Sequence, residues 1–393
     1  MKYSEIKNDI EAIFQGNDFA FISASLQSPT QYSFPEKELH DVISERAFSY
    51  ISLHKPQLQL EFDVPFPPPT CEEFSFIDLF AGIGGFRIPM QREGGKCLFS
   101  SEFNPHAQAV YCANYGEYPF GDITKIPVNI IPNHDVLCGG FPCQPFSISG
   151  KMKGFEDTRG TLIYNVFEII KAKQPKVVFL ENVKHLVYHD KGRTLKTILE
   201  GLRNLGYKAS YQVMNASNFG VPQNRERIII IASKDKIFDF SKVEIHKRAT
   251  IRDIMDTDSS KYEYLKEPYT ILERFTQQPS GLIFVGYRNK NIRKAGVRPG
   301  TEHLSRVHKQ PNRIYSIDGV HPALPSQECS GRFFVYDGKN VRKLTIDECY
   351  RLQGFPNTFI KDKTLGEAYR QVGNAVCVPM IQEIVKQIKA QLL

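Results

Sequence analysis

A cysteine in a short, proline-flanked loop could act as a nucleophile. Cys143 lies in the segment GGFPCQPFS at 139–147, just after apolar residues that predict a strand. A thiolate reacts when it is partly exposed and lies near positive charge or amide donors, and lysines at 151 and 153 could supply that charge. Taken alone, this loop slightly favours a structural cysteine. The chemistry depends on which other groups the fold brings to the loop.

Three other side chains could meet this cysteine. Glu181 follows the apolar run at 177–180, where a carboxylate with a raised pKa could donate a proton. In isolation, a helix cap or an ion-pair acid is about as well favoured for Glu181. Arg225 and Arg227 precede the apolar run at 228–231, and strand alternation would point both to one face. One or both could therefore reach the same site.

A glycine turn follows the first predicted strand. The segment DLFAGIGG at 78–85 could let the backbone approach a nucleotide-like ligand. The dinucleotide fingerprint requires a third glycine at position 87, where Arg87 stands, so a flavin or nicotinamide cofactor with a pyrophosphate is disfavoured.

Two acids could complete an adenosine site. Glu102 lies 24 positions after Asp78, near the offset of about 20 at which an acid usually binds ribose. Asp122, in the segment GDI, could accept from an exocyclic amine. Each acid alone could be an ordinary surface carboxylate, but together they suit adenosine without phosphates.

Alternating strands and helices must position these groups. Apolar runs predict strands at 74–80, 96–102, 134–140, 176–182 and 227–233, and helical patterns fall at 105–115, 161–173 and 195–205, the last with Gly206 at its C-cap. Strands that are apolar at every position are typical of a parallel sheet covered on both faces. Further helices are expected after Thr345, which begins a capping box with Glu348, and at 378–393. The fold class is therefore α/β with a wound sheet.

The charge distribution separates three parts of the chain. Residues 1–64 contain two amphipathic helical patterns and carry five basic and ten acidic side chains, and a proline-rich linker follows at 65–69. From about 234 to 339 the periodicity gives way to turn-rich sequence, in which 284–313 has eight basic residues and one acid. Such a stripe suits a polyanion, although a solvated face is the better interpretation of an isolated charge run.

Composition excludes several classes of protein. With 393 residues, 41% of them hydrophobic and 24% charged, the chain is an ordinary folded protein. The sequence has no apolar run of about 18 residues and no leader pattern, so we expect no membrane contact and a cytoplasmic location. Eight cysteines without a C-x-x-C pair fit a reducing compartment. His185 and His189 lack a third ligand, so no metal site is predicted.

The ordered motifs resemble those of the bacterial DNA (cytosine-5) methyltransferases of restriction-modification systems. The matching segments are DLFAGIGG, the Glu102 segment, GDI, GFPCQPFS, ENV, QNRER, RKLTIDECYRLQGFP and YRQVGNAV. The resemblance implies a Rossmann-like domain that binds S-adenosylmethionine, made from 72–240 and 341–393, with a small target-recognition domain inserted at 241–340. A short helical extension at 1–64 lies outside the shared pattern, and packing is its plainest role.

The resemblance also implies roles for particular residues. Cys143 would add to C6 of a flipped-out cytosine, Glu181 would bind N3 and the exocyclic amine, Arg225 would hold the base, and Pro142 would shape the loop. The residues expected to bind the cofactor are Phe80, Gly82, Gly84, Glu102, Asp122, Ile123, Leu162 and Asn374. The residues expected to contact DNA are Gln144, Ser147, Arg227, Arg288, Arg293, Arg298, Arg306 and Arg313.

The expected function is methylation of C5 in a short, specific duplex sequence by a monomer, with a restriction endonuclease as a separately acting partner. A tRNA cytosine-5 methyltransferase is the nearest alternative, and the basic insert of about a hundred residues favours DNA. A binding protein without catalysis is a third hypothesis, which the intact set of Cys143, Glu181 and Arg225 disfavours. The family's Thr-Leu pair has Ala323-Leu324 as its nearest counterpart, so the base-reading residues stay open.

Overall fold

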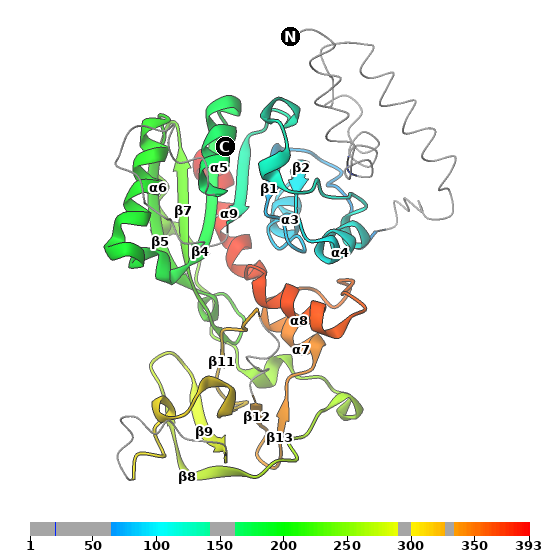
Figure 1. Ribbon diagram of the computed structural model, residues 1–393, viewed down its shortest axis with the longest axis vertical. Coiled ribbons are helices and arrows are strands. Elements are labelled where there is room, and N and C mark those ends of the chain that lie inside the picture. The colour runs from blue at the N-terminus through cyan, green and yellow to red at the C-terminus, as the bar shows by residue number, and fades with distance from the viewer. Residues whose placement is uncertain (1–19, 21–63, 142–161, 290–299, 327–333) are drawn as a thin grey trace, which may run out of the picture. The chain divides into compact units, whose positions relative to one another are not determined.

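The chain forms two compact units. The computed structural model describes Ala20, 64–141, 162–289, 300–326 and 334–393. The first unit consists of Met1–Val213, Ile228–Val243 and Ile384–Leu393, and the second of Met214–Arg227 and Glu244–Glu383. Figure 1 labels their elements. The helices expected within 1–64 lie outside the described residues except for Ala20, which is helical and buried.

A six-stranded sheet organises the first unit. Its strand order is β2-β1-β3-β4-β7-β5. The strands are β1 (Phe74–Leu79), β2 (Gly95–Ser101), β3 (Val136–Gly140), β4 (Val177–Val183), β5 (Lys208–Asn215) and β7 (Glu226–Ser233). β1 pairs in parallel with both β2 and β3, and β3 pairs in parallel with β4. The chain leaves β1 for one neighbour and later returns on the other side, so the strand order reverses at β1, where such sheets bind ligands.

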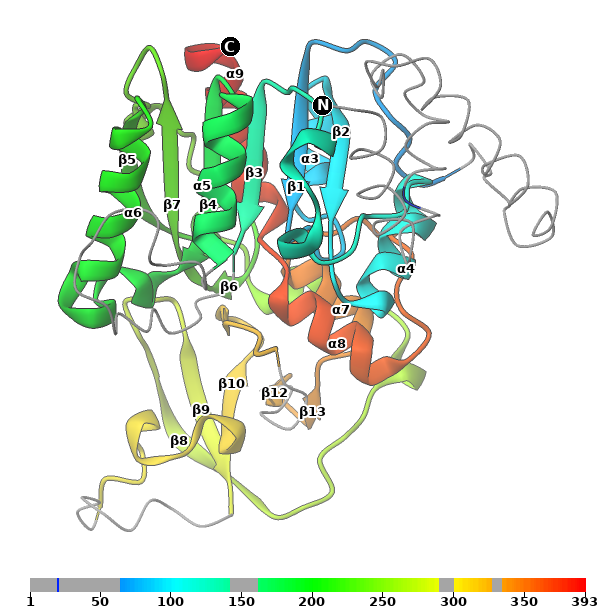
Figure 2. The ribbon, with the colours of Figure 1, turned by 45° about the horizontal axis from the view of Figure 1, so that its top comes forward.

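The helices of this unit include the three that were expected between the strands. They are α3 (Arg87–Arg92), α4 (Pro105–Tyr115), α5 (Leu162–Lys173) and α6 (Arg193–Asn204), and the 3-10 helices are Ile123–Lys125, Val128–Ile130, Lys184–Val187, His189–Gly192 and Phe240–Lys242. Asn104 caps α4 by accepting from the backbone of His106 and Ala107, and Gly116 ends it in the left-handed conformation. α5 and α6 lie side by side over one face of the sheet (Figures 1 and 2), with their apolar side chains in its core.

The second unit is built on a different sheet. Its strand order is β13-β12-β10-β9-β8. The strands are β8 (Tyr269–Gln277), β9 (Ile283–Arg288), β10 (Arg313–Ser316), β12 (Phe334–Tyr336) and β13 (Val341–Lys343). A short parallel pair joins β6 (Gln223–Asn224) to β11 (His321–Pro322). The helices are α7 (Ile346–Leu352) and α8 (Leu365–Asn374), and the 3-10 helices are Ala216–Asn218, Ile251–Ile254, Ser259–Lys261, Ser305–Val307 and Gln310–Asn312.

Helix α9 (Val378–Leu392) runs from residues of the second unit into residues of the first. The second unit reaches Glu383, whereas the motif-based division places 341–393 with the catalytic domain. The two compact units and the domains expected from the motifs therefore differ in where they place 341–383. The domain limits of the sequence analysis stay a prediction.

The second sheet is the main element that the sequence analysis did not predict. That analysis found only irregular sequence between 234 and 339, whereas four of the five strands lie within it. β8 is half-buried at its start and exposed along its second half, and β10, β12 and β13 have only three or four residues. Such strands show no sustained alternation, so periodicity could not reveal them.

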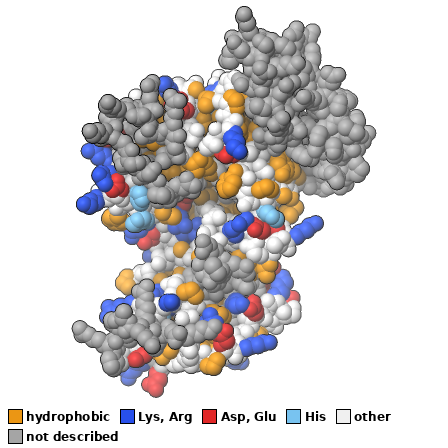
Figure 3. All heavy atoms as spheres, viewed as in Figure 1, with side chains coloured by type: hydrophobic (Ala, Val, Ile, Leu, Met, Phe, Trp, Pro, Cys, Tyr) orange, Lys and Arg blue, Asp and Glu red, His pale blue; other side chains and the backbone are white. Residues whose placement is uncertain are grey.

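None of the described helices is long and apolar enough to cross a membrane. The same residues contain no group of three or more metal-ligating side chains. On the face seen in Figure 3, lysine and arginine side chains are scattered among acids rather than gathered in one patch.

Candidate active site

The turn after β1 has a left-handed backbone conformation that residues other than glycine rarely adopt. Phe80, Gly82 and Gly84 have φ values of 56°, 54° and 82°. For the non-glycine residue Phe80, this left-handed backbone costs about 1–3 kcal/mol, and such strain gathers at ligand sites. The Ala81 amide donates to the carbonyl oxygen of Ser101 at 2.9 Å, which ties the turn to the end of β2.

Glu102 links this turn to the next segment of the chain. Its Oε2 accepts from the Gly82 amide at 2.9 Å, and its Oε1 accepts from the Asn104 amide at 2.8 Å. Burial raises the pKa of the Glu102 carboxyl, and the backbone hydrogen bonds oppose that shift. The predicted ribose acid and the glycine turn are therefore in direct contact.

The glycine turn is packed on one side and open on the other. A Cβ at Gly84 would lie 2.3 Å from the Tyr115 ring, whose hydroxyl donates to the Gly84 carbonyl at 2.8 Å. A Cβ at Gly82 would meet nothing within 4 Å among the described atoms. The open side at Gly82 is where a ligand could approach the backbone.

The Asp122 segment is tied to the same edge. The Glu102 amide donates to the carbonyl of Phe120, two residues before Asp122, at 2.8 Å. The Oδ1 of Asp122 caps a 3-10 helix by accepting from the Thr124 amide at 3.0 Å, and Ile123 is buried. Asp122 and Ile123 thus follow, by two and three residues, the Phe120 carbonyl that Glu102 binds. Phe80 and Leu162 pack, partly buried, against the same core cluster.

The carboxyl ends of β3 and β4 carry the predicted catalytic segments. Glu181 is buried and lies opposite Gly140 in the parallel register. The side-chain amide of Asn182 donates to the Phe141 carbonyl at 2.8 Å. Phe141 immediately precedes the proline-cysteine segment, so β4 anchors the point where that loop begins. Pro142, Cys143, Gln144 and Ser147 lie outside the described residues.

Arg225 is buried within the second unit. It lies between β6 and β7, so strand alternation does not govern its direction. Its guanidinium donates to the carbonyl oxygens of Leu324 at 3.2 Å, Gly373 at 2.9 Å and Ala375 at 2.8 Å. Arg227 is half-buried and donates to the Glu226 carbonyl, and Asn374 is exposed at the end of α8. Arg225 thus ties its own segment to two other backbone segments of its unit, at Leu324 and at Gly373–Ala375.

The basic residues of the recognition segment differ in their surroundings. Arg288 pairs with Glu267 and stacks over the Phe334 ring at 4.9 Å. Arg313 donates to the His308 carbonyl at 3.0 Å and to Gln310. Arg306 is exposed, and Arg293 and Arg298 lie outside the described residues. Arg288 and Arg313 therefore have structural partners within the unit.

Three residues that position or border the site were missed by the sequence analysis. Phe103, directly after Glu102, is 74% exposed. An aromatic residue next to a predicted ribose acid could have been recognised from the sequence as a candidate for contact with adenine. Asn182 lies in the segment ENV, and the sequence analysis assigned it no role of its own. Tyr115 carries no sequence signal, because only the fold shows that its ring fills the space beside Gly84.

Comparisons with known proteins identify the family. The family described as C-5 cytosine-specific DNA methylase matches residues 74–390. The chain is 43% identical over 369 residues to the type II methyltransferase M.HpaII of Haemophilus parainfluenzae, covering 90% of this chain and 98% of that protein. It is 39% identical to M.HhaI of Haemophilus parahaemolyticus, covering 81% and 94%.

A solved structure supports the fold. The Dnmt2 methyltransferase of S. pombe superposes with a TM-score of 0.60 at 19% identity, over 82% of this chain and all of that one. At this identity the likeness speaks for the architecture alone, whereas the sequence matches extend over both units. The chain belongs to the C-5 cytosine-specific DNA methylases and is a DNA (cytosine-5-)-methyltransferase.

Proposed function

We propose that this chain methylates C5 of a cytosine within a short, specific sequence of duplex DNA, using S-adenosylmethionine and a covalent adduct at Cys143. The observation that carries the proposal is the pairing of β3 with β4. Glu181 lies opposite Gly140, three residues before Cys143, and a chain of three residues spans at most about 11 Å. The Cα of Cys143 can therefore lie no more than about 11 Å from that of Gly140, the register partner of Glu181.

The residues present fit S-adenosylmethionine. Gly82 leaves open space beside the backbone, Glu102 is held at the end of β2, and Phe103 offers an exposed ring next to it. In this proposal Phe80 and Phe103 contact adenine, Glu102 binds the ribose hydroxyls and Asp122 binds the adenine amine. S-adenosylmethionine supplies an electrophilic methyl group when it is bound.

The chemistry on cytosine needs a base that has left the duplex. C5 and C6 are buried in the base stack, and flipping the nucleotide costs a few kcal/mol. The Cys143 thiolate forms a bond to C6 while Glu181, hydrogen-bonded at N3, stabilises the developing charge. C5 would then accept the methyl group, with S-adenosylhomocysteine as the leaving group; a base would remove the C5 proton, and the bond from sulfur to C6 would break.

The segment 241–340 is proposed to read the DNA sequence. Its strands belong to a sheet separate from the six-stranded one. Arg306, in the 3-10 helix Ser305–Val307 of this segment, is exposed. Relatives named as type II methyltransferases support a role in the protection of host DNA. We further propose that the enzyme is a cytoplasmic monomer and that an endonuclease acts separately.

The test is transfer of a labelled methyl group to unmethylated genomic DNA, with tRNA and the Cys143→Ser protein in parallel. Label should enter DNA and vanish with the variant, while DNA binding persists, because a hydroxyl is a far weaker nucleophile at neutral pH. Sequencing the modified cytosines would give the target site. Label in tRNA alone, or wild-type rates in the variant, would overturn the proposal.

A further inference from the structure

The Asp78 carboxyl group is buried without a hydrogen bond. Asp78 is the fifth residue of β1 and lies between Ser100 of β2 and Cys138 of β3. Its side chain is completely inaccessible, and neither carboxylate oxygen has a hydrogen-bond partner among the described residues. An isolated buried carboxylate is strongly disfavoured, so such a group loses its charge or gains a cationic partner.

The nearest cation is already committed to other groups. Arg87, on α3, donates to Glu117 at 2.9 Å, to the Tyr111 hydroxyl at 3.0 Å and to Gln91 at 2.5 Å. The guanidinium also lies 5.0 Å from the centre of the Tyr115 ring. Arg87 therefore stabilises an ionised Asp78 only through space.

The other titratable groups around Asp78 do not supply positive charge. Glu117 and Glu102 are acids, and their charges act on Asp78 in the opposite sense to that of Arg87. The remaining groups are the thiols of Cys97 and Cys138 and the phenols of Tyr111 and Tyr115, whose own pKa values burial raises. Burial, more than any of these charges, raises the pKa of Asp78 well above its usual value. The surroundings of Asp78 thus hold three carboxyl groups, its own included, and one guanidinium.

The position of Asp78 connects this imbalance to the cofactor. Asp78 lies two residues before Phe80 and four before Gly82, in the strand that leads into the turn open at Gly82. S-adenosylmethionine carries a sulfonium, an ammonium and a carboxylate, for a net charge of +1. Its product S-adenosylhomocysteine has a neutral thioether and no net charge. The substrate and the product of methyl transfer thus differ by the one charge that this cluster lacks.

We propose that Asp78 is neutral in the free enzyme and ionises when the sulfonium binds, so that cofactor binding releases a proton and the enzyme prefers the cationic cofactor to its neutral product. This inference rests on the proposed function, which supplies the identity of the ligand. The proton leaves the Asp78 carboxyl for solvent, and the charge of the carboxylate then balances that of the sulfonium. After methyl transfer the positive charge is gone, Asp78 takes up a proton again, and the product is held less tightly.

Calorimetry can count the proton directly. S-adenosylmethionine, S-adenosylhomocysteine and sinefungin, which carries an amine in place of the sulfonium, would each be titrated into the full chain without DNA. Each titration would be run at neutral pH in phosphate and in Tris, because the difference in heat between buffers reports the protons released. We expect release approaching one proton with the two cationic ligands and far less with S-adenosylhomocysteine.

Two variants assign the proton to its source. Asp78→Asn should abolish the release and lower the preference for S-adenosylmethionine over S-adenosylhomocysteine by about tenfold, a change of about 1.4 kcal/mol. Glu102→Gln is the matched control, because it should weaken all three ligands while keeping the release. Thermal unfolding and circular dichroism would establish that both variants are folded.

Each remaining outcome would overturn the inference. Equal proton release with the sulfonium and the thioether would mean that the ammonium, common to both, is the partner. Release that persists in Asp78→Asn, or that disappears only in Glu102→Gln, would assign the proton elsewhere. Intact binding without release overturns this inference alone, whereas failure of all three ligands to bind the wild-type protein contradicts the proposed function as well.

Discussion

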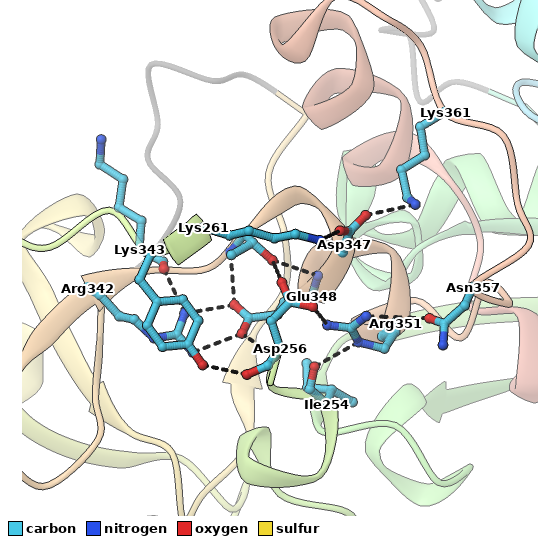
Figure 4. Close-up of polar contacts among 12 residues, drawn as sticks. Ile254, Asp256, Lys261, Arg342, Lys343, Asp347, Glu348, Arg351, Asn357 and Lys361 are labelled. Carbon is cyan, nitrogen blue, oxygen red and sulfur yellow. Dashed lines mark hydrogen bonds and ion pairs between the residues drawn. The ribbon is translucent and has the colours of Figure 1, made fainter. Parts of the chain in front are cut away.

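Arg342 and Glu348 form a fully buried ion pair in which two guanidinium nitrogens donate to the two carboxylate oxygens, each at 2.8 Å (Figure 4). Arg342 comes from β13 and Glu348 from α7, so the pair joins the second sheet to the helix that follows it. The Tyr262 ring covers the guanidinium at 3.8 Å, and the Asp256 amide donates to Glu348 at 2.9 Å. Glu348 also closes the capping box with Thr345.

Arg342→Met should therefore destabilise the second unit by about 3–5 kcal/mol, because Glu348 would keep a buried charge without its partner. Urea unfolding would measure the loss. The double variant Arg342→Met/Glu348→Leu should recover part of it. Arg252→Ala, which breaks an exposed pair with Asp318, should change stability by less than about 1 kcal/mol. Equal effects of the buried and exposed changes would contradict this assignment.

Two glycines of the cofactor turn should respond differently to the same substitution. Gly84→Ala places a Cβ against the Tyr115 ring and should lower the melting temperature clearly, beyond the roughly 1–2 kcal/mol cost of a left-handed alanine. Gly82→Ala meets open space and should show only that backbone cost, yet it should weaken S-adenosylhomocysteine binding by filling the ligand's approach. Thermal unfolding and calorimetry separate the two effects. Unchanged affinity in Gly82→Ala would remove this glycine from the cofactor site.

The first unit should lose stability in mild acid. His134 is buried, its Nδ1 contacts the Pro132 carbonyl at 2.8 Å, and burial lowers the pKa of its imidazole to about 4. Between pH 6.5 and about 4 the unfolded chain binds a proton at this position that the folded chain does not. The contribution of His134 to the free energy of unfolding should fall by about 3 kcal/mol across this range and change no further below it.

His134→Gln is the check on this acid sensitivity. Burial also lowers the pKa of His321 to about 4, so His321 acts in the same direction and some sensitivity should persist in the variant. Urea unfolding at a series of pH values would give both slopes. A variant with the wild-type slope would show that other groups govern the response.

DNA binding should weaken steeply with salt, and the arginines should contribute unequally. Each phosphate contact adds about 0.9 to the slope of log K against log salt. Arg306→Gln should lower that slope by about one, since this side chain is exposed. Arg288→Gln should leave the slope nearly unchanged and lower stability, because Arg288 pairs with Glu267 and stacks on Phe334. A flat salt response of the wild-type protein would show that the basic stripe is only a solvated face.

The sequence predicted those helices and strands that have strong local signals, such as caps and a continuous apolar face. α4 and α5 have the predicted extents to within one residue, because a proline at N1, an asparagine cap and a left-handed glycine mark α4, and a clear apolar face marks α5. The capping box at Thr345 is confirmed. The fully apolar strands β4 and β7 were predicted for the same reason, since burial on both faces leaves an uninterrupted apolar run.

What the sequence could not predict depends on contacts between distant segments. Glu348 was expected only in a capping box, but it also pairs with Arg342 of β13, a contact that depends on how that strand and α7 pack. Arg225 was expected to follow strand alternation, whereas it lies between two strands and binds carbonyls about 100 to 150 residues away. The roles assigned by resemblance to Pro142, Cys143, Gln144 and Ser147 stay predictions, because these residues lie outside the described part of the chain.

The burial of the cysteines has a practical consequence for chemical probes. Cys97, Cys138 and Cys377 are buried, and burial raises the thiol pKa of each, that of Cys377 to about 11. Cys112, partly buried, likewise has its pKa raised to about 11, and Cys349 is buried. Among the described cysteines, only Cys71 is exposed. Replacing Cys71 and Cys329 by serine should thus leave Cys143 as the single site for alkylating dyes or mechanism-based inhibitors, so that occupancy of the reactive thiol could be titrated by mass.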